Sequence, residues 1–172
     1  MNKPLEIAQL GHAVLRQQAK KIHNVHDPEV VKMIERMLYT LSESNGVGLA
    51  APQVFLSFCI VIIASRPSER YPSAPKMEPV VMLNPGYEKL SDTVKKDWEG
   101  CLSIPGIRAL VPRYSQIKIN YTDCQGKQKE LIANDFIARI FQHEYDHLNG
   151  LLYLDRVEDN KDIISESEFQ KK

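Results

Sequence analysis

The chain has 172 residues, in which 22 Lys and Arg are balanced by 22 Asp and Glu, so its formal net charge is zero. At roughly 150 residues per domain, this length predicts a single catalytic-sized domain over residues 1–172. The charge balance argues against a protein built for direct sequence-specific nucleic acid binding or for an anionic membrane. Hydrophobic residues at 43% and charged residues at 26% exclude a wholly disordered chain.

No targeting or membrane signal stands out in the sequence. Residues 1–30 contain no apolar run of signal-peptide length. The longest apolar run, residues 58–64, is far shorter than the roughly 20 residues of a membrane-spanning helix. Three cysteines without a close pair fit a reducing compartment. We therefore expect a cytoplasmic protein with no membrane partner.

The first predicted element is a helix over residues 27–44. Asp27 suits the N-cap, Pro28 suits the first helical position, and apolar residues follow at helical spacing until Asn45 and Gly46. Strands are predicted at residues 55–64, 80–84, 107–111 and 117–121, where apolar residues run together or alternate. Residues 66–79 contain four prolines and predict a surface loop.

The second half of the chain predicts a hairpin and a second helix. Residues 117–132 form the hairpin, with its turn at residues 123–126, and Asn134 can cap a helix that stops at Gly150. A polar tail, helical or frayed, follows at residues 159–172. The predicted fold class is α+β, with mixed or antiparallel sheets packed around a central helix and the N-terminal helix outside.

The central helix carries the sequence HEYDH, an HExxH motif. Four residues of helix bring His147 to within about 40° of His143, so both imidazoles can hold one metal ion. Glu144 lies one step around the helix, where its carboxylate can reach a water without ligating the metal. Two solvent-exposed histidines are the alternative, but their face also carries Phe136 and Ile140, which indicates a buried position.

A catalytic metal site needs a third protein ligand and an open position. The position of a third histidine in the extended motif holds Tyr153, and the downstream glutamates lie in a short polar tail. Cys101, between the predicted strands, would complete a Cys/His/His set. Cys59 lies in an apolar run and Cys124 in a turn, so neither is a good candidate.

Residues 46–53, GVGLAAPQ, form a third segment of interest. Its two glycines allow another backbone to approach closely, and Gln53 supplies a neutral amide donor. Taken alone, this segment is better interpreted as a helix C-cap that runs into a tight turn.

In chain order, GVGLAAPQ, EGCLS at residues 99–103 and HEYDH at residues 143–147 match every fixed position of the motifs of the peptide deformylases. The resemblance covers about residues 5–157, and the 66–79 loop and the tail lie in regions where such proteins vary. It implies a hydrolase that removes the formyl group from the N-terminal formylmethionine of nascent polypeptides and releases formate. A contact with the ribosome near the exit tunnel is a further candidate interaction that the resemblance leaves open.

The resemblance implies a role for each motif residue. Cys101, His143 and His147 would bind one divalent metal ion, most typically Fe²⁺, with Ni²⁺, Co²⁺ or Zn²⁺ as other candidates. Glu144 would accept a proton from the attacking water and return it to the amine that leaves. The Gln53 amide and the backbone N–H of Leu102 would stabilise the oxyanion.

The predicted substrate site follows from the same segments. Val47, Ile140 and Phe136 can form an apolar pocket for methionine, although core packing explains Phe136 equally well. Gly46, Gly48 and Gly100 can let the peptide bind as an added strand. Arg108 resembles a family position near the substrate backbone, with a solvated residue at a strand edge as the alternative.

Two other functions remain open on the sequence alone. The first is a zinc endopeptidase whose third ligand is unidentified. The second is a non-catalytic binding module that a metal stabilises, although such a site needs four protein ligands and no fourth candidate stands at suitable spacing.

Overall fold

The computed structural model describes residues 3–67 and 71–172. Its helices are α1 (Pro28–Ser42), α2 (Asp135–Leu148) and the short α3 (Glu166–Phe169). The strands are β1 (Gly48–Ala50), β2 (Ile60–Ser65), β3 (Met77–Lys89), β4 (Val94–Cys101), β5 (Ile104–Tyr114), β6 (Gln116–Thr122), β7 (Gln128–Asn134) and β8 (Ile163–Ser165). The strand order is β1-β2-β3-β6-β7 in one sheet and β4-β5-β8 in the other.

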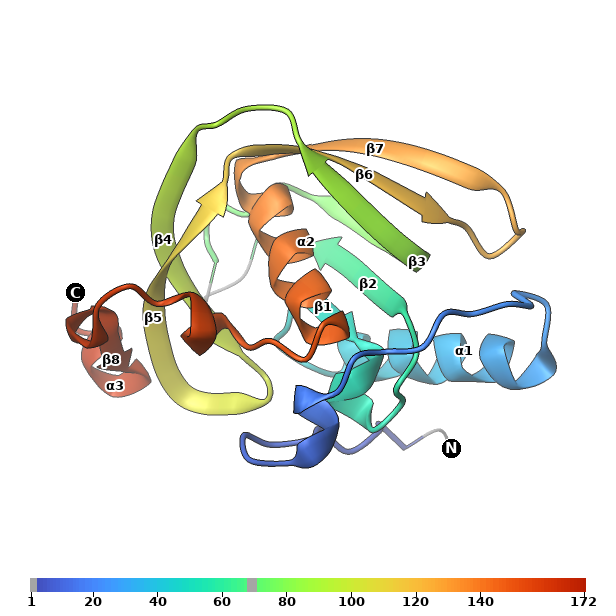
Figure 1. The fold of residues 1–172 in the computed structure, drawn as a ribbon. Helices are drawn as coiled ribbons and strands as arrows, with labels where there is room; N and C mark the ends of the chain where they lie inside the picture. Colours follow the sequence, from blue (N-terminus) through green and yellow to red (C-terminus); the bar gives the residue numbers. More distant parts are fainter. Residues whose placement is uncertain (1–2, 68–70) are drawn as a thin grey trace.

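All paired strands are antiparallel, and α2 lies between the two sheets (Figure 1). The larger sheet has one helix on each face, which the alternation along β2 explains. Val61 and Ile63 join the core cluster that contains α2, whereas Ile60 and Ile62 join the cluster that contains α1. The predicted α+β architecture, with a central HExxH helix and an outer N-terminal helix, is confirmed.

The first helix agrees with its prediction. Asp27 accepts a hydrogen bond from the backbone N–H of Glu29, and Pro28 occupies the first turn. The second helix also ends as predicted, because Gly150 follows the C-cap with φ 69°. Asn134 occupies the predicted N-cap position of α2, but its side chain makes no capping hydrogen bond and instead accepts one from Gln116 Nε2, at 2.9 Å.

The strands differ from their predictions in three ways. The strand expected at residues 55–64 begins only at Ile60, because residues 51–54 form a 3-10 turn and Phe55 has φ 63°. β3 is longer than the predicted 80–84 and takes up the last three residues of the expected 66–79 loop. β4 was not predicted at all, since Lys95, Lys96 and Asp97 are exposed and its pairing with β5 determines it. Residues 68–70 of the expected loop lie outside the described residues.

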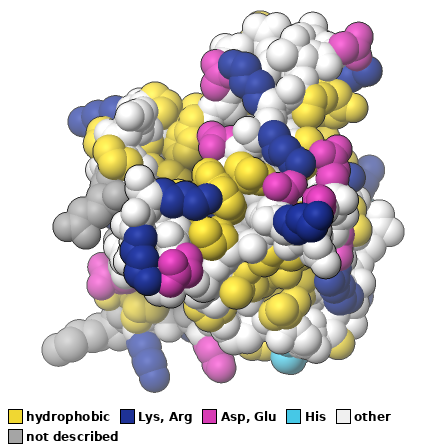
Figure 2. Space-filling view, turned by 90° about the vertical axis from the view of Figure 1, so that its left-hand side faces the viewer, with side chains coloured by type: hydrophobic (Ala, Val, Ile, Leu, Met, Phe, Trp, Pro, Cys, Tyr) yellow, Lys and Arg dark blue, Asp and Glu magenta, His cyan; other side chains and the backbone are white. Residues whose placement is uncertain are grey.

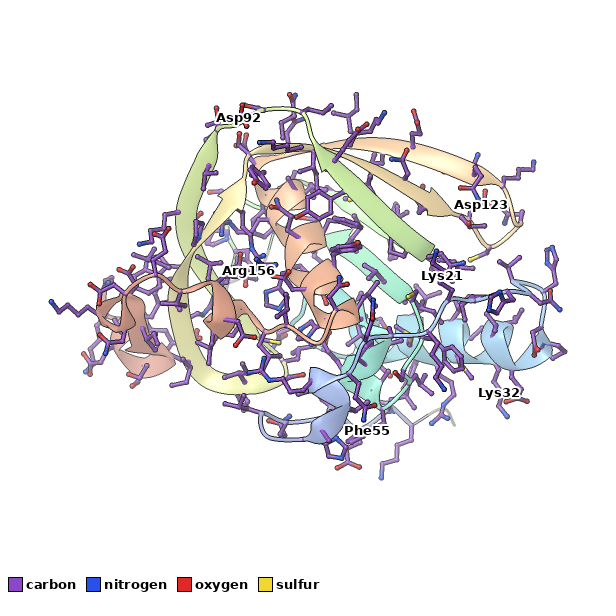
Figure 3. The ribbon with its side chains drawn as sticks, viewed as in Figure 1. Lys21, Lys32, Phe55, Asp92, Asp123 and Arg156 are labelled. Atoms are coloured by element: carbon purple, nitrogen blue, oxygen red, sulfur yellow. The ribbon has the colours of Figure 1, made fainter. Side chains whose placement is uncertain are left out.

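The hairpin of β6 and β7 is confirmed, with Asp123 at its turn (Figure 3). Of the two alternatives for the tail at residues 159–172, helical or frayed, the structure agrees with the helical one. β8 pairs with β5, and α3 follows it directly. Figure 2 shows the side of the molecule that carries this segment, with basic and acidic side chains intermixed around apolar patches. None of the helices in the described residues could cross a membrane.

Candidate metal centre

Three buried side chains from two elements meet beside α2. His143 and His147 lie one helical turn apart, with their ring centroids 5.2 Å from each other. Cys101 ends β4, where the register with β5 shifts, and its Sγ lies 3.3 Å from His147 Nε2. One ligand atom from each residue lies within 4.8 Å of the other two. Among the described residues, no other group of three or more potential ligands is this close.

The chemistry of this donor set fits a divalent transition metal. One thiolate and two imidazoles are ligands that zinc and iron accept, and three protein ligands leave a position open. Glu99 Oε2 lies 2.9 Å from His143 Nδ1, which directs the other ring nitrogen away from Glu99. His147 Nδ1 is buried and has no hydrogen-bond partner within residues 3–67 and 71–172. The residues present therefore fit the metal that the HExxH motif predicts.

A cluster of paired charges supports the metal ligands. Glu99 is 4% exposed and accepts two hydrogen bonds from Arg113, at 2.8 and 3.0 Å. Arg113 also reaches Asp146 of α2, at 2.6 Å, and Arg139 donates to Glu99 at 2.8 Å. Arg156, whose side chain is partly exposed to solvent, also pairs with Asp146 and lies beside α2 in Figure 3. We call Glu99, Arg113, Arg139 and Asp146 the buried ion cluster; Arg156 is exposed and lies outside it.

The ion cluster keeps Glu99 ionised. Burial raises the pKa of a carboxyl group, but here Arg113 and the hydrogen bond with His143 outweigh burial. The pKa of Glu99 therefore falls well below its usual range. An ionised Glu99 can hold the proton on His143 Nδ1 and so fix the tautomer of this ring.

Glu144 has the opposite environment. It is 5% exposed, and its Oε2 atom has no hydrogen-bond partner in the part of the chain that the structure describes. Burial raises the pKa of the Glu144 carboxyl to about 7. A Cβ atom added at Gly48 would lie 2.4 Å from Glu144 Oε1, so this glycine makes room for the carboxylate. Glu144 is thus a buried carboxyl whose free oxygen is available to a substrate or a water.

Gln53 places its side-chain amide next to Cys101. Its Oε1 accepts a hydrogen bond from the backbone N–H of Ala50, at 2.8 Å, which orients Nε2 toward Cys101 Sγ and Ser103 Oγ, each 3.4 Å away. Residues 48–50 form a strand that pairs with β2, and residues 51–54 form a 3-10 turn. The interpretation of this segment as only a helix cap and tight turn is therefore wrong.

A narrow cavity of about 50 Å³ opens onto these groups. Its walls include most of the residues that the sequence predicted, namely Gly46, Val47, Gly48, Gln53, Gly100, Cys101, Leu102, Phe136, Ile140, His143 and Glu144. His147 does not line this cavity, although its ring nitrogen contacts Cys101.

Sequence reasoning missed four further wall residues: Tyr71, Trp98, Glu99 and Arg139. Glu99 had a signal, because it begins the EGCLS motif. Tyr71 had none, since it lies in a proline-rich segment without periodicity.

Arg108 does not line this cavity. It lines a neighbouring groove, and its side chain is only 1% exposed. β5 lies between β4 and β8, so the alternative of a solvated residue at a strand edge is wrong. Glu166 of α3 accepts two hydrogen bonds from its guanidinium, at 2.6 and 3.0 Å.

Comparisons with known proteins agree on one family. The family model of polypeptide deformylase matches residues 4–162. Peptide deformylase 2 of Nostoc sp. is 49% identical over 166 residues, which are 96% of this chain and 93% of that protein. Peptide deformylase 2 of Shewanella oneidensis is 44% identical over 155 residues, which are 90% of this chain and 85% of that protein.

Solved structures show the same likeness. The class I type b peptide deformylase of Acinetobacter baumannii with Met-Ala-Ser bound has a TM-score of 0.88 and 40% identity, with coverage of 91% of this chain and 100% of that one. A peptide deformylase of Synechococcus elongatus in complex with actinonin has a TM-score of 0.82 and 38% identity, with coverage of 94% and 84%. From its motifs, its fold and these matches, the chain belongs to the polypeptide deformylase family.

Proposed function

We propose that residues 1–172 act as one catalytic domain that removes the formyl group from N-formylmethionyl peptides, with Glu144 as general base. Peptide deformylases are metal-dependent hydrolases, and this chain belongs to that family. The observation that carries the proposed residue roles is the Cys/His/His group beside a buried carboxyl with a free oxygen. A structural metal site has no use for that carboxyl.

Cys101, His143 and His147 would hold one divalent cation in this proposal, with Fe²⁺ as the native metal. The cation would polarise the formyl carbonyl and lower the pKa of water to near neutrality. A thiolate ligand beside iron is open to oxidation. We expect the iron form to lose activity in air and a nickel-substituted form to keep it, which timed formate assays would measure. Equal rates of decay would contradict the choice of iron.

Glu144 moves the proton in the proposed mechanism. Its carboxylate accepts a proton from the attacking water and then delivers it to the nitrogen of the methionine as the C–N bond of the formamide breaks. The products are formate and a free amino terminus. The Gln53 Nε2–H and the backbone N–H of Leu102 donate to the oxygen on which negative charge develops. Gln53 is preorganised for this by its bond to Ala50.

The narrow cavity would take the methionine side chain. Val47, Phe136 and Ile140 supply apolar wall, and all three are packed against the α2 core cluster or belong to it. β1 is an edge strand, so the segment from Gly46 to Gly48 can pair with an extended peptide. Gly100 also lines the cavity, without a side chain to obstruct the peptide.

The place of action follows from the substrate. Formylated chains emerge from the ribosome, so we extend the proposal to the cytoplasm and to the neighbourhood of the exit tunnel. Co-sedimentation with ribosomes that carry a formylated nascent chain would test this extension. Absence of the protein from the ribosome pellet would contradict it.

A single assay separates the proposed function from the endopeptidase alternative. A formyl-Met peptide and the same peptide without the formyl group are incubated with the metal-loaded protein and analysed by mass spectrometry. We expect loss of the formyl group from the first and no change in the second. Cleavage of an internal bond in either peptide would overturn the proposal in favour of the endopeptidase.

A further inference from the structure

A wide groove adjoins the narrow cavity. It has a volume of about 850 Å³, against about 50 Å³ for the cavity, and the two share Cys101 and Leu102 in their walls. Asn45, the neighbour of Gly46, lies on the wall of the groove as well. The groove therefore adjoins the narrow cavity at Cys101 and Leu102.

The C-terminal segment, residues 163–172, forms one wall of this groove. Glu166, Phe169 and Gln170 all line it. The segment is fixed to β5, because β8 pairs with residues 107–109. Phe169 also contacts Trp98, with the ring centroids 5.3 Å apart, and Trp98 lines the narrow cavity. The segment thus touches the walls of both spaces.

The charges of the groove neutralise each other. Among the described residues that line it, Arg108 and Glu166 are the only charged side chains. Two hydrogen bonds join the Arg108 guanidinium to the Glu166 carboxylate. The guanidinium carbon of Arg108 also lies 4.9 Å from the centroid of the Phe169 ring. Glu166 is 29% exposed, whereas Arg108 is 1% exposed, so the acidic partner is the one nearer to solvent.

We propose that the C-terminal segment is part of the substrate site, where Phe169 and Gln170 face the side chains that follow the formylmethionine and Glu166 cancels the charge of Arg108. This inference rests on the proposed function. An extended peptide advances about 3.3 Å per residue, so the residues that follow a formylmethionine held in the narrow cavity can reach a groove that shares two wall residues with it. A neutral groove accepts either sign of charge, as an enzyme that acts on many different chains requires.

Gln170 offers a test that leaves the Arg108–Glu166 pair intact. It is exposed and lines the groove, so Gln170→Glu and Gln170→Lys add charge with little risk to folding. The substrates are formyl-Met-Ala-Ala-Ala peptides with a single Glu or a single Lys at position two, three or four. For each enzyme, the ratio of kcat/KM for the Lys peptide to kcat/KM for the Glu peptide is measured at low salt. We expect Gln170→Glu to raise this ratio and Gln170→Lys to lower it, each by roughly two- to fivefold at one position.

Glu166→Gln tests the role of the ion pair. It exposes the charge of Arg108, so we expect the same ratio to fall in favour of Glu peptides, through KM rather than kcat. The matched control is Glu168→Gln, which removes the same charge from the same helix. Glu168 is suitable because it does not line the groove and pairs with Lys171 instead. The control should leave the ratio unchanged.

The outcomes separate this inference from the proposed function. Failure of the unaltered enzyme to release formate from any peptide would refute the proposed function itself. Release of formate with the same ratio in both Gln170 variants, at all three substrate positions, would overturn the inference alone. An equal shift in Glu166→Gln and Glu168→Gln would also overturn the role of Glu166, because a general loss of negative charge would then explain it.

Discussion

Two sets of buried polar groups lie on α2 and its neighbours, and they differ in how they are satisfied. In the ion cluster, Glu99, Arg113 and Asp146 are joined by hydrogen bonds of 2.6 to 3.0 Å. Glu144 Oε2 and His147 Nδ1 are equally buried but have no partner among the described residues. Burial of an unpaired polar atom costs stability, so a fold keeps one only where something else requires it.

This difference indicates which buried groups hold other residues in position and which groups take part in the reaction. Paired groups are held in one arrangement and can hold others, as Glu99 holds His143. A carboxylate oxygen that its own chain leaves free can exchange a proton with a substrate. We therefore expect damage to the ion cluster to reduce stability first, and damage to the metal ligands or Glu144 to reduce activity first.

The largest expected effect comes from the ligands. Cys101→Ala and His147→Ala should each lose both bound metal and all measurable turnover, because two remaining ligands hold a cation poorly. Metal analysis of the purified variants and a formate assay measure the two losses. Cys59→Ala and Cys124→Ala are the controls, since both thiols lie outside the ligand group and should change neither quantity. A Cys101→Ala protein with full metal content would contradict the assignment of this ligand.

Glu144→Ala should lower kcat by about 10²–10⁴-fold and leave the metal content unchanged. Loss of the general base removes the proton acceptor but none of the three proposed ligands. Steady-state kinetics and metal analysis on one preparation test both halves of this expectation. Full activity in the variant would overturn the proposed mechanism.

Arg113→Met should reduce the free energy of unfolding by roughly 3–5 kcal/mol, because it leaves Glu99 and Asp146 as buried charges without this partner. Arg156→Met is the matched control, since Arg156 also pairs with Asp146 but its side chain is 44% exposed. We expect the control to cost about 1 kcal/mol or less. Urea denaturation measures both values, and equal losses would show that burial of the cluster is not what matters.

Gly48→Ala should lower kcat by about 10- to 100-fold, the smallest of these effects, because the new methyl group displaces the Glu144 carboxylate. Gly86→Ala is the control, as a Cβ added there meets no atom within 4 Å. Kinetics on a formyl-Met peptide give the comparison. Unchanged kcat in Gly48→Ala would show that Glu144 can act from another position.

The sequence predicted the elements whose signals are local. α1 and α2 have helical periodicity and clear end signals, and the hairpin turn at residues 123–126 is marked by Asp and Gly. β4 and β8 have no comparable signal, because their pairing with β5 is what makes them strands. A strand that is defined by its pairing rather than by an apolar pattern is not visible in its own residues.

The candidate site also has residues that the sequence identified and contacts that it did not. Short motifs identified the three proposed ligands, Glu144 and Gln53, since spacing or family pattern marks each one. The partnership of Arg108 with Glu166 was not predictable, because 58 residues separate the two and only the fold of the tail brings them together. The hydrogen bonds from Arg113 to Glu99 were not predictable either, because β4, which carries Glu99, has no strand signal in its own residues.

One measurement tests the central claim most directly: formate release from a formyl-Met peptide, followed on a single sample while its metal is removed by a chelator and then restored. We predict that turnover falls in proportion to the metal content and returns on addition of Fe²⁺ or Ni²⁺, with about one ion per chain at full activity. Formate release that persists after the metal has been removed would contradict a catalytic role for the Cys101, His143 and His147 site.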